Sequence, residues 1–286
     1  VDSVDMAGLQ KYRLDSIPKL QAEKRKELQA RQVPAAEIDE MLAAREEKLR
    51  REAQLRRPFL SANDRSRWCT VRALVEPEMR VEGAPYAIDK VIQEQGWDTI
   101  DMVKHDGHLY SSKPPLFPTL MAAEYWVIHR LTGANLGDAP YAVGRFMLAT
   151  INALPMLVFF WLLAKLLERF GATDWSRVFV AAAAAFGTFL TTFSVVINNH
   201  APAAICTMVA LYAAVRIWFD DERRWRYFAV AGFFAAFAVA DELPALAFFA
   251  ALGAALLWKN PAKTLAAFAP AAAVVAVAFF ATNWIA

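Results

Sequence analysis

Polar side chains that could take part in chemistry gather in two short runs of the sequence. The first run contains Asp64 and Arg67, and the second contains Tyr110 and Lys113. A carboxylate can accept the proton of a hydroxyl that attacks another group. Guanidinium and ammonium groups can stabilise a negative charge that grows during a reaction. The two runs together therefore hold a candidate proton acceptor and candidate cations for an anionic group.

Asp64 and Lys113 also have purely structural explanations. Asn and Asp are favoured at the start of helices, so Asp64 could cap the helix that follows it. Lys113 could lay its apolar stem along a membrane surface and place its ammonium among lipid headgroups. Residues 105–108, which surround Gly107, predict a hairpin turn without chemistry. The residue types alone leave both interpretations of Asp64 and Lys113 open.

Weaker candidates lie further along the chain. Arg145 stands in an apolar run, where a charge is costly without a partner or a function, so it could reach a lipid phosphate or a headgroup. Asn199 and His200 form a polar turn between two apolar runs, and His200 could bind an acceptor or a metal. Glu242, next to Asp241, could face the same cavity or end a helix. A divalent metal stays open, because one histidine without a second ligand at a recognised spacing does not define a metal site.

The charges of the chain are strongly segregated. Of its 286 residues 57% are hydrophobic, yet it holds 31 Lys or Arg and 29 Asp or Glu, and only 17 of these charges lie from Tyr141 onward. This pattern predicts a charged part and a membrane-embedded part that meet near Tyr141. No basic cluster is interleaved with aromatic residues, so a nucleic-acid partner is not expected. Cys69 and Cys206 lie in different parts, which predicts no disulfide framework.

The first 57 residues predict a helical hairpin. Residues 9–30 and 35–57 are polar and helix-forming, and Pro34 breaks the chain between them. Pairs such as Glu46 and Arg50 would lie on the surface of the second helix. The apolar positions near one face of that helix are Ile38, Met41, Leu42, Leu49 and Leu55. The hairpin is interpreted as a solvated spacer or docking arm, or as a coiled coil that binds a protein partner through residues 8–57.

The second half of the chain predicts a bundle of membrane-spanning helices. A helix needs roughly 20 apolar residues to cross a bilayer. Apolar runs of about this length, the fourth and fifth shorter, cover residues 141–164, 178–197, 201–218, 227–240, 243–258 and 264–284. The two short runs predict a tilted or re-entrant pair. Because the chain stops inside an apolar run and no signal peptide precedes its charged part, we treat it as a fragment with further spans on both sides.

The connections between the apolar runs predict an orientation. Three basic connections alternate with connections that have no Lys or Arg; the basic residues are Lys165, Arg169, Arg177, Arg216, Arg223, Arg224, Arg226, Lys259 and Lys263. Cytoplasmic loops carry an excess of Lys and Arg, so residues 198–200, residues 241–242 and Asn283 are expected on the other side. Residues 58–140 are then extracytoplasmic, with residues 117–131 as an interfacial helix on the membrane.

The two polar runs resemble the first outer loop of the GT-C membrane glycosyltransferases, in the branch of the protein O-mannosyltransferases and the aminoarabinose transferase of lipid A. In that branch an Asp-Glu-x-Arg-Tyr motif opens the loop and a Tyr-x-x-Lys-Pro-Pro-Leu motif closes it. Residues 64–68 (Asp-Arg-Ser-Arg-Trp) stand for the first motif, and residues 110–116 (Tyr-Ser-Ser-Lys-Pro-Pro-Leu) match the second. Arg65 replaces the family's Glu, so any role of that Glu in metal or acceptor binding is open here. The resemblance covers residues 58–286 and leaves the hairpin as an insertion.

The resemblance implies transfer of a sugar from a polyprenyl-phosphate carrier to an acceptor hydroxyl outside the cytoplasm. Asp64 would accept the proton of that hydroxyl. Lys113 and Arg67 would bind the lipid phosphate as its charge grows, Tyr110 would add a hydroxyl donor, and Arg145 would reach the same phosphate. The residues assigned to an acceptor or a metal are His200, Asn199 and Glu242.

The sequence thus predicts an all-α, polytopic membrane protein in three parts. These are a charged hairpin (residues 1–57), an extracytoplasmic active-site loop with interfacial helices (residues 58–140) and transmembrane helices (residues 141–286). The expected location is a bacterial inner (plasma) membrane, and the expected partners are membrane lipid and the polyprenyl-phosphate sugar. Two other classes stay open, because a transporter or lipid flippase would also place charges at helix breaks, and a non-catalytic scaffold would use the hairpin for docking.

Overall fold

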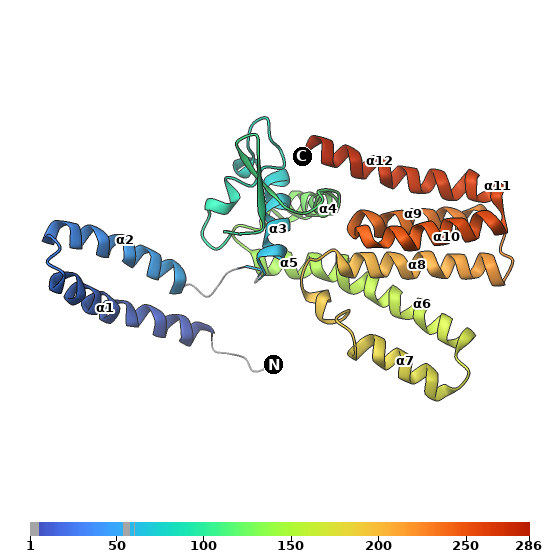
Figure 1. Ribbon diagram of the computed structural model, residues 1–286, viewed down its shortest axis with the longest axis horizontal. Coiled ribbons are helices and arrows are strands. Elements are labelled where there is room, and N and C mark those ends of the chain that lie inside the picture. Colours follow the sequence, from blue (N-terminus) through green and yellow to red (C-terminus); the bar gives the residue numbers. More distant parts are fainter. Residues whose placement is uncertain (1–5, 54–57, 60) are drawn as a thin grey trace.

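The computed structural model describes residues 6–53, 58–59 and 61–286 (Figure 1). The predicted hairpin is confirmed: α1 (Met6–Ala30) and α2 (Ala35–Ala53) lie side by side. Its small apolar core consists of Leu28, Ile38 and Leu42. Ile38 and Leu42 are four positions apart and so share the face that packs on α1.

Other expectations for the hairpin have mixed outcomes. Met41 is 46% exposed, so it does not belong to the buried face on which the sequence placed it. Leu55 lies outside the described residues. The surface pair is confirmed, since Arg50 Nε lies 2.9 Å from Glu46 Oε1.

Between the hairpin and the bundle, residues 58–139 form a small unit around α3 (Ala62–Val75) and α4 (Leu116–Thr132). We call it the outer unit because it lies outside the helical bundle. Two short strands, β1 (Met102–His105) and β2 (His108–Ser111), pair antiparallel. The turn between them is the predicted one: Asp106 and Gly107 both have positive φ, 45° and 87°, as the tight turns that fit twisted hairpins require. This two-stranded sheet departs from the all-α fold that the sequence predicts.

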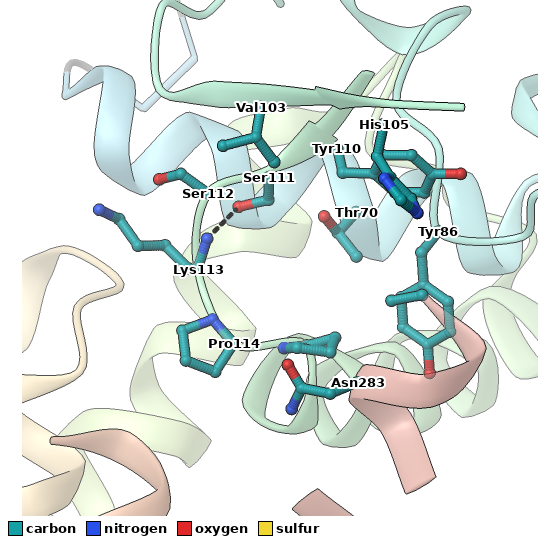
Figure 2. A pocket seen from close by; sticks show the side chains of 12 residues that line it. Thr70, Tyr86, Val103, His105, Tyr110, Ser111, Ser112, Lys113, Pro114 and Asn283 are labelled. Atoms are coloured by element: carbon teal, nitrogen blue, oxygen red, sulfur yellow. Dashed lines mark hydrogen bonds between the residues drawn. The ribbon is translucent and has the colours of Figure 1, made fainter. Parts of the chain in front are cut away.

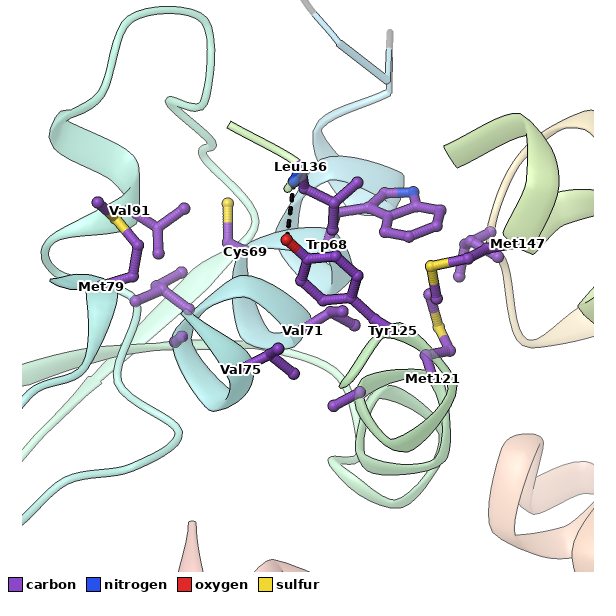
Figure 3. Packing of buried hydrophobic residues seen from close by; sticks show 14 of the residues in the cluster. Trp68, Cys69, Val71, Val75, Met79, Val91, Met121, Tyr125, Leu136 and Met147 are labelled. Atoms are coloured by element: carbon purple, nitrogen blue, oxygen red, sulfur yellow. Dashed lines mark hydrogen bonds between the residues drawn. The ribbon is translucent and has the colours of Figure 1, made fainter. Parts of the chain in front are cut away.

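The core of this unit lies between α3 and α4 (Figure 3). Trp68 and Tyr125 are fully buried there, and Met121 and Met147 pack beside them. The Tyr125 hydroxyl donates to Glu76 Oε1 at 2.6 Å and accepts from the Leu136 amide at 2.8 Å. The buried hydroxyl therefore has a partner both as a donor and as an acceptor. The opposite face of α4 exposes large apolar side chains, namely Leu120, Trp126, Val127 and Leu131. An amphipathic helix of this kind fits the predicted interfacial helix, whose contact with a membrane stays a prediction.

The remaining residues form a helical bundle. Its elements are α5 (Pro140–Leu148), the π-helical turn η3 (Ala149–Ala153), α6 (Leu154–Phe170), α7 (Asp174–Phe186), α8 (His200–Phe219), α9 (Trp225–Asp241), η5 (Leu243–Ala245), α10 (Leu246–Lys259), α11 (Pro261–Lys263), η6 (Thr264–Phe268) and α12 (Ala269–Ile285). Three continuous helical stretches among the described residues are long and apolar enough to span a membrane: Pro140–Phe170, His200–Phe219 and Pro261–Ile285. Crossing by the shorter helices stays a prediction.

The expected span at residues 178–197 is wrong. Helix α7 ends at Phe186, and the next helical turn is the short 3-10 helix η4 (Thr192–Val195). Gly187 caps the end of α7, and beyond it Thr188 donates to the Ala184 carbonyl and Thr191 to the Ala185 carbonyl, both at 2.8 Å. Such side-chain bonds occupy carbonyls that would otherwise continue the helix.

The two ends of the bundle differ in charge, as the basic connections predict. At one end Arg169 pairs with Asp220 and Lys259 lies 3.2 Å from Asp221, so the ends of α6, α8 and α10 meet there. At the opposite end His200, which begins α8, contacts Glu242, which follows α9, at 2.8 Å. Helices α9 and α10 therefore each run from one end of the bundle to the other, and whether the pair is tilted or re-entrant in a membrane stays a prediction.

Candidate functional site

Asp64 lies in the first turn of α3, and only 2% of its surface is exposed. Its Oδ1 accepts a hydrogen bond from Trp68 Nε1 at 2.9 Å and from the backbone amide of Ile197 at 3.0 Å. Ile197 belongs to the segment that leads into α8, so the carboxylate joins the outer unit to the bundle. Ser61, not Asp64, occupies the N-cap position of α3. The capping explanation of Asp64 is therefore wrong.

Burial raises the pKa of Asp64 from 3.8 to about 6, although the bonds from Ile197 and Trp68 and the charge of Arg67 oppose the rise. Removing a carboxylate from water disfavours its charged form. A carboxylate with a pKa close to the working pH both accepts a proton readily and is largely ionised near neutral pH. Asp64 is therefore a candidate general base.

The guanidinium of Arg67, one helical turn after Asp64, is also buried. Its Nε and Nη2 atoms donate to Asn199 Oδ1 at 3.1 and 2.7 Å, and Nη1 donates to the backbone oxygen of Asn63 at 2.9 Å and to the Asn63 side chain. All of these acceptors are uncharged. Within the described part of the chain Arg67 forms no ion pair with a carboxylate, so its charge is held in place without being neutralised by direct contact.

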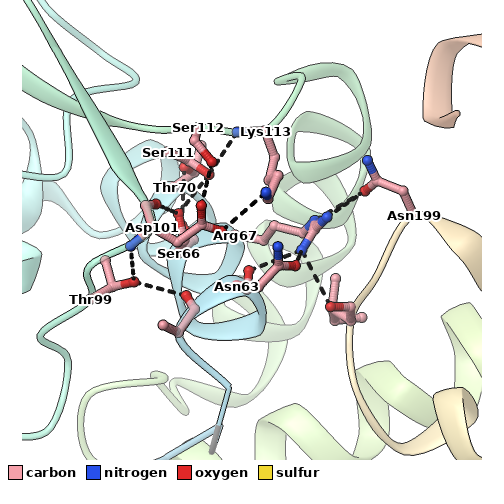
Figure 4. A network of polar contacts seen from close by, with 12 residues as sticks. Asn63, Ser66, Arg67, Thr70, Thr99, Asp101, Ser111, Ser112, Lys113 and Asn199 are labelled. Carbon is pink, nitrogen blue, oxygen red and sulfur yellow. Dashed lines mark hydrogen bonds and ion pairs between the residues drawn. The ribbon is translucent and has the colours of Figure 1, made fainter. Parts of the chain in front are cut away.

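Asn199 connects three elements. Its Oδ1 accepts from Arg67 on α3 (Figure 4), while its Nδ2 donates to the backbone oxygen of Asp241 at 2.9 Å. Asn199 directly precedes α8, and Asp241 ends α9. The arrangement brings together residues that the sequence proposed separately, Arg67 and Asn199, and it places them beside Asp64 through the Ile197 amide.

Lys113 is fixed by a second polar cluster, built around Ser66 of α3 beside Arg67 (Figure 4). Its ammonium lies 3.4 Å from Asp101 Oδ2, and both side chains are mostly buried. Ser66 donates to the Asp101 backbone oxygen at 2.6 Å and lies 2.7 Å from the Ser111 hydroxyl oxygen. A side chain held in this way does not extend freely toward headgroups, which counts against the snorkelling explanation.

His200 and Glu242 form a pair at the end of the bundle, with the imidazole Nδ1 2.8 Å from Oε1. The His200 side chain is 63% exposed and stacks on Phe193 at 5.7 Å between ring centroids. No group of three His, Cys, Asp or Glu side chains in the described part of the chain is arranged to hold a metal ion. The side chains present therefore do not fit the divalent metal that the sequence leaves open.

Two predicted residues lie apart from this network. Arg145 is on an exposed face of α5, and no contact joins it to Asp64 or Lys113. Tyr110 lies on β2, where it lines a cavity of about 320 Å³ instead of the Arg67 cluster (Figure 2).

Arg65, which stands where the resembled family has Glu, has a structural role. Its Nε and Nη1 atoms donate to the backbone oxygens of Asp98 and Phe59, both at 2.6 Å. Arg65 therefore ties the loop before β1 and the chain entering α3 to the helix. A guanidinium suits this task because its fixed fork of donors can reach several carbonyls at once.

Sequence reasoning missed the residues that hold the candidates in place. Asp101 and Asn63 position Lys113 and Arg67, but nothing in their sequence spacing distinguishes them from solvated polar residues. Asn152 is fully buried in the π-helical turn η3, and its Nδ2 donates to the Ser194 and Val196 carbonyls at 3.1 and 2.9 Å. It supports the segment that supplies the Ile197 amide to Asp64. A polar residue within an apolar span was the available signal.

No protein-family model, curated protein or solved structure gives a significant match to the chain. Any proposed function therefore rests on the geometry of the site alone. It combines a buried carboxylate of raised pKa, a buried guanidinium with uncharged partners and a second fixed cation, all where the outer unit meets one end of the bundle.

Proposed function

We propose that the protein is a membrane glycosyltransferase that transfers a sugar from a polyprenyl-phosphate carrier to an extracytoplasmic acceptor hydroxyl. The observation that supports it most is Asp64, a buried carboxylate with a pKa near 6 at the junction of the outer unit and the bundle, one helical turn from Arg67. A base and a cation in this relation suit a reaction that removes a proton on one side of a carbon atom and builds negative charge on the other.

In the proposed reaction the acceptor hydroxyl gives its proton to Asp64 while its oxygen forms a bond to the anomeric carbon of the sugar. The bond between that carbon and the phosphate oxygen breaks, and the carrier phosphate leaves with the electron pair. Arg67 and Lys113 stabilise its growing charge. The proton on Asp64 is then lost to water, which restores the base.

The contacts of Arg67 and Lys113 agree with their proposed role as ligands of the phosphate. Arg67 has uncharged oxygen partners, so a phosphate would not have to displace a carboxylate from direct contact with it. Lys113 is paired with Asp101, and a phosphate would replace or share that carboxylate. Tyr110 and Arg145 are not assigned to the phosphate, since they lie away from the Arg67 and Asp101 network.

The carrier's hydrocarbon chain also has a candidate position. An apolar cavity of about 480 Å³ lies among α9, α10 and α12, and Leu243, directly after Glu242, forms part of its wall. The cavity therefore extends from the polar end of the bundle into its apolar part. An isoprenoid segment fits such a lining, because it offers no hydrogen-bonding groups.

The proposal includes an orientation. The polar end that carries Asp64 and Asn199 faces away from the cytoplasm, and the basic end faces the cytoplasm of a bacterial inner membrane. Residues 8–57 would project outside the cytoplasm and could contact a protein partner.

Release of the carrier tests this function directly. Full-length protein in lipid nanodiscs is supplied with radiolabelled polyprenyl-phosphate sugar and an extract of cell-envelope glycolipids and proteins as acceptors. The proposal requires free polyprenyl phosphate to form together with a labelled acceptor, and the Asp64→Asn variant to lose both products. Movement of intact labelled lipid between leaflets without cleavage would favour a flippase. If the lipid is neither cleaved nor moved, the non-catalytic scaffold is the remaining function.

A further inference from the structure

The segment that carries Lys113 has two faces. The Lys113 ammonium points toward Asp101, away from a cavity of about 320 Å³ on the other side of the segment (Figure 2). Tyr110, three residues earlier, faces that cavity. The cavity lies between the β-hairpin, the loop that carries Tyr86, and the end of α12. It is thus separate from the Asp64 and Arg67 cluster, and none of the steps described above takes place in it.

The lining of this cavity combines rings with neutral hydrogen-bonding groups. Tyr86 and Tyr110 contribute phenol rings and His105 an imidazole, Lys113 also borders the wall, and no Asp or Glu side chain among the described residues does. Hydroxyl or amide groups come from Thr70, Tyr86, Tyr110, Ser111, Ser112 and Asn283. The hydroxyls of Thr70, Tyr86, Ser111 and Ser112 already have hydrogen-bond partners within the protein. Among the described residues the Tyr110 hydroxyl has no hydrogen-bond partner, and neither does the Asn283 carboxamide oxygen, whose nitrogen donates to Phe279. Donors and acceptors that can serve a ligand are therefore present beside aromatic faces.

We propose that this cavity binds a neutral saccharide unit of the acceptor. A sugar ring presents C–H faces that pack on aromatic rings and hydroxyls that both donate and accept hydrogen bonds, which matches this lining. An anionic ligand is a poorer match, because the nearest ammonium points to the other side of the segment. The volume is at the small end of the roughly 300–1,000 Å³ found for ligand pockets, which suits one or two sugar rings.

The position of the cavity relative to Asp64 rests on the proposed function. Thr70 lines the cavity and lies six residues after Asp64 on α3, about 9 Å along the helix axis at 1.5 Å per residue. A sugar bound there is too far from Asp64 to react itself. It is close enough for a neighbouring hydroxyl of the same acceptor to reach the base, so the cavity acts as a remote subsite that orients the acceptor.

Binding can be measured without turnover. Saturation-transfer NMR on the full-length protein in nanodiscs is carried out with methyl glycosides of glucose, mannose, galactose and N-acetylglucosamine and with their common disaccharides. At least one of these probes should bind, and Tyr110→Ala should weaken that binding about 3- to 10-fold, the size expected for an aromatic contact. Tyr110→Phe separates the ring from the hydroxyl and preserves the shape of β2. Tyr12→Ala, at a tyrosine that is 72% exposed on the hairpin, is the matched control and should leave binding unchanged.

The outcomes separate this inference from the proposed function. Asp64→Asn should bind the glycosides like the parent protein. Glycoside binding that depends on Tyr110, in a protein that transfers no sugar, would support the subsite and refute the transferase. Sugar transfer with an acceptor KM that is the same in the parent and in Tyr110→Ala would refute the subsite alone. The subsite is also refuted if no probe binds, or if Tyr110→Ala and Tyr12→Ala bind equally.

Discussion

Asn199 Oδ1 accepts hydrogen bonds from two nitrogen atoms of Arg67, a residue 132 positions earlier in the chain. The bond pair attaches α3 of the outer unit to the start of α8 in the bundle. Because Asn199 also donates to the Asp241 backbone, the position of Arg67 depends on two bundle helices. The relation suggests that Asn199 acts through Arg67 and does not contact the reacting groups.

Replacement of Asn199 by Ala should lower both stability and donor use. It would leave two buried guanidinium N–H groups without an acceptor, at a cost of about 1–3 kcal/mol in the free energy of unfolding. Thermal unfolding in detergent measures the loss. If Asn199 positions Arg67, the KM for the lipid donor should also rise more than kcat falls, and Asn199→Asp, which keeps the acceptor oxygen, should recover part of it. Equal effects from Asn135→Ala, on a surface loop, would contradict this role.

Sidedness can be tested with cysteines at exposed positions. Asp106 is 85% exposed at the hairpin turn and Arg224 is 55% exposed at the basic end. The native Cys69 and Cys206 are both buried, so background labelling should be low. A membrane-impermeant maleimide added to intact cells should label Asp106→Cys and not Arg224→Cys. Labelling of Arg224→Cys alone would reverse the orientation and remove the extracytoplasmic site.

Local patterns in the sequence were sufficient to predict several parts of this structure. The break at Pro34, the turn around Gly107 and the opposite ends marked by Arg223 and Asn199 all depend on neighbouring residues, and all are present. The expected span at residues 178–197 failed because hydropathy does not register where Thr188 and Thr191 bond to helix carbonyls.

The environment of Asp64 could not be predicted in the same way. Its burial and raised pKa depend on Ile197, 133 residues away, and a contact at that separation leaves no local pattern. The same holds for Lys113 and Asp101, whose ion pair follows from the way the chain returns past α3. Residue types indicated which groups could do chemistry, and only the fold determines which of them meet.

The pH dependence should report the state of Asp64. Its pKa is about 6 in the folded protein against 3.8 for the free side chain, so between these values the folded state binds more protons than the unfolded state. The Asp64 contribution to stability therefore decreases as pH rises from about 4 to about 6 and is constant above that range. Asp64→Asn should remove this part of the slope in denaturant titrations at several pH values. An unchanged slope would mean that Asp64 does not titrate in this range.

Loss of the Lys113 ammonium should act on the lipid donor. Lys113→Ala removes a cation that would stabilise the departing phosphate, so donor kcat/KM should fall roughly 10- to 100-fold, equivalent to about 1.4–2.7 kcal/mol. Lys104→Ala, at an exposed residue of β1, is the control. A donor kcat/KM equal to that of the control would leave Lys113 as a structural partner of Asp101.

Replacement of Asp64 by Asn distinguishes a base from a purely structural group. The Asn side-chain oxygen can still accept the hydrogen bonds from Trp68 and the Ile197 amide, so the variant should insert normally. At neutral pH it should be at least as stable as the parent protein, because the neutral amide does not carry the burial cost of the ionised carboxylate. It cannot take up a proton near neutral pH, and transfer should therefore fall roughly 100-fold or more, the usual scale for loss of a general base. The parent rate should also rise with pH up to about 6 and then level off, as the carboxylate ionises. Asp106→Asn, at the exposed hairpin turn, should keep the parent rate and profile. Transfer by Asp64→Asn at the parent rate would leave Asp64 as a link between the outer unit and the bundle.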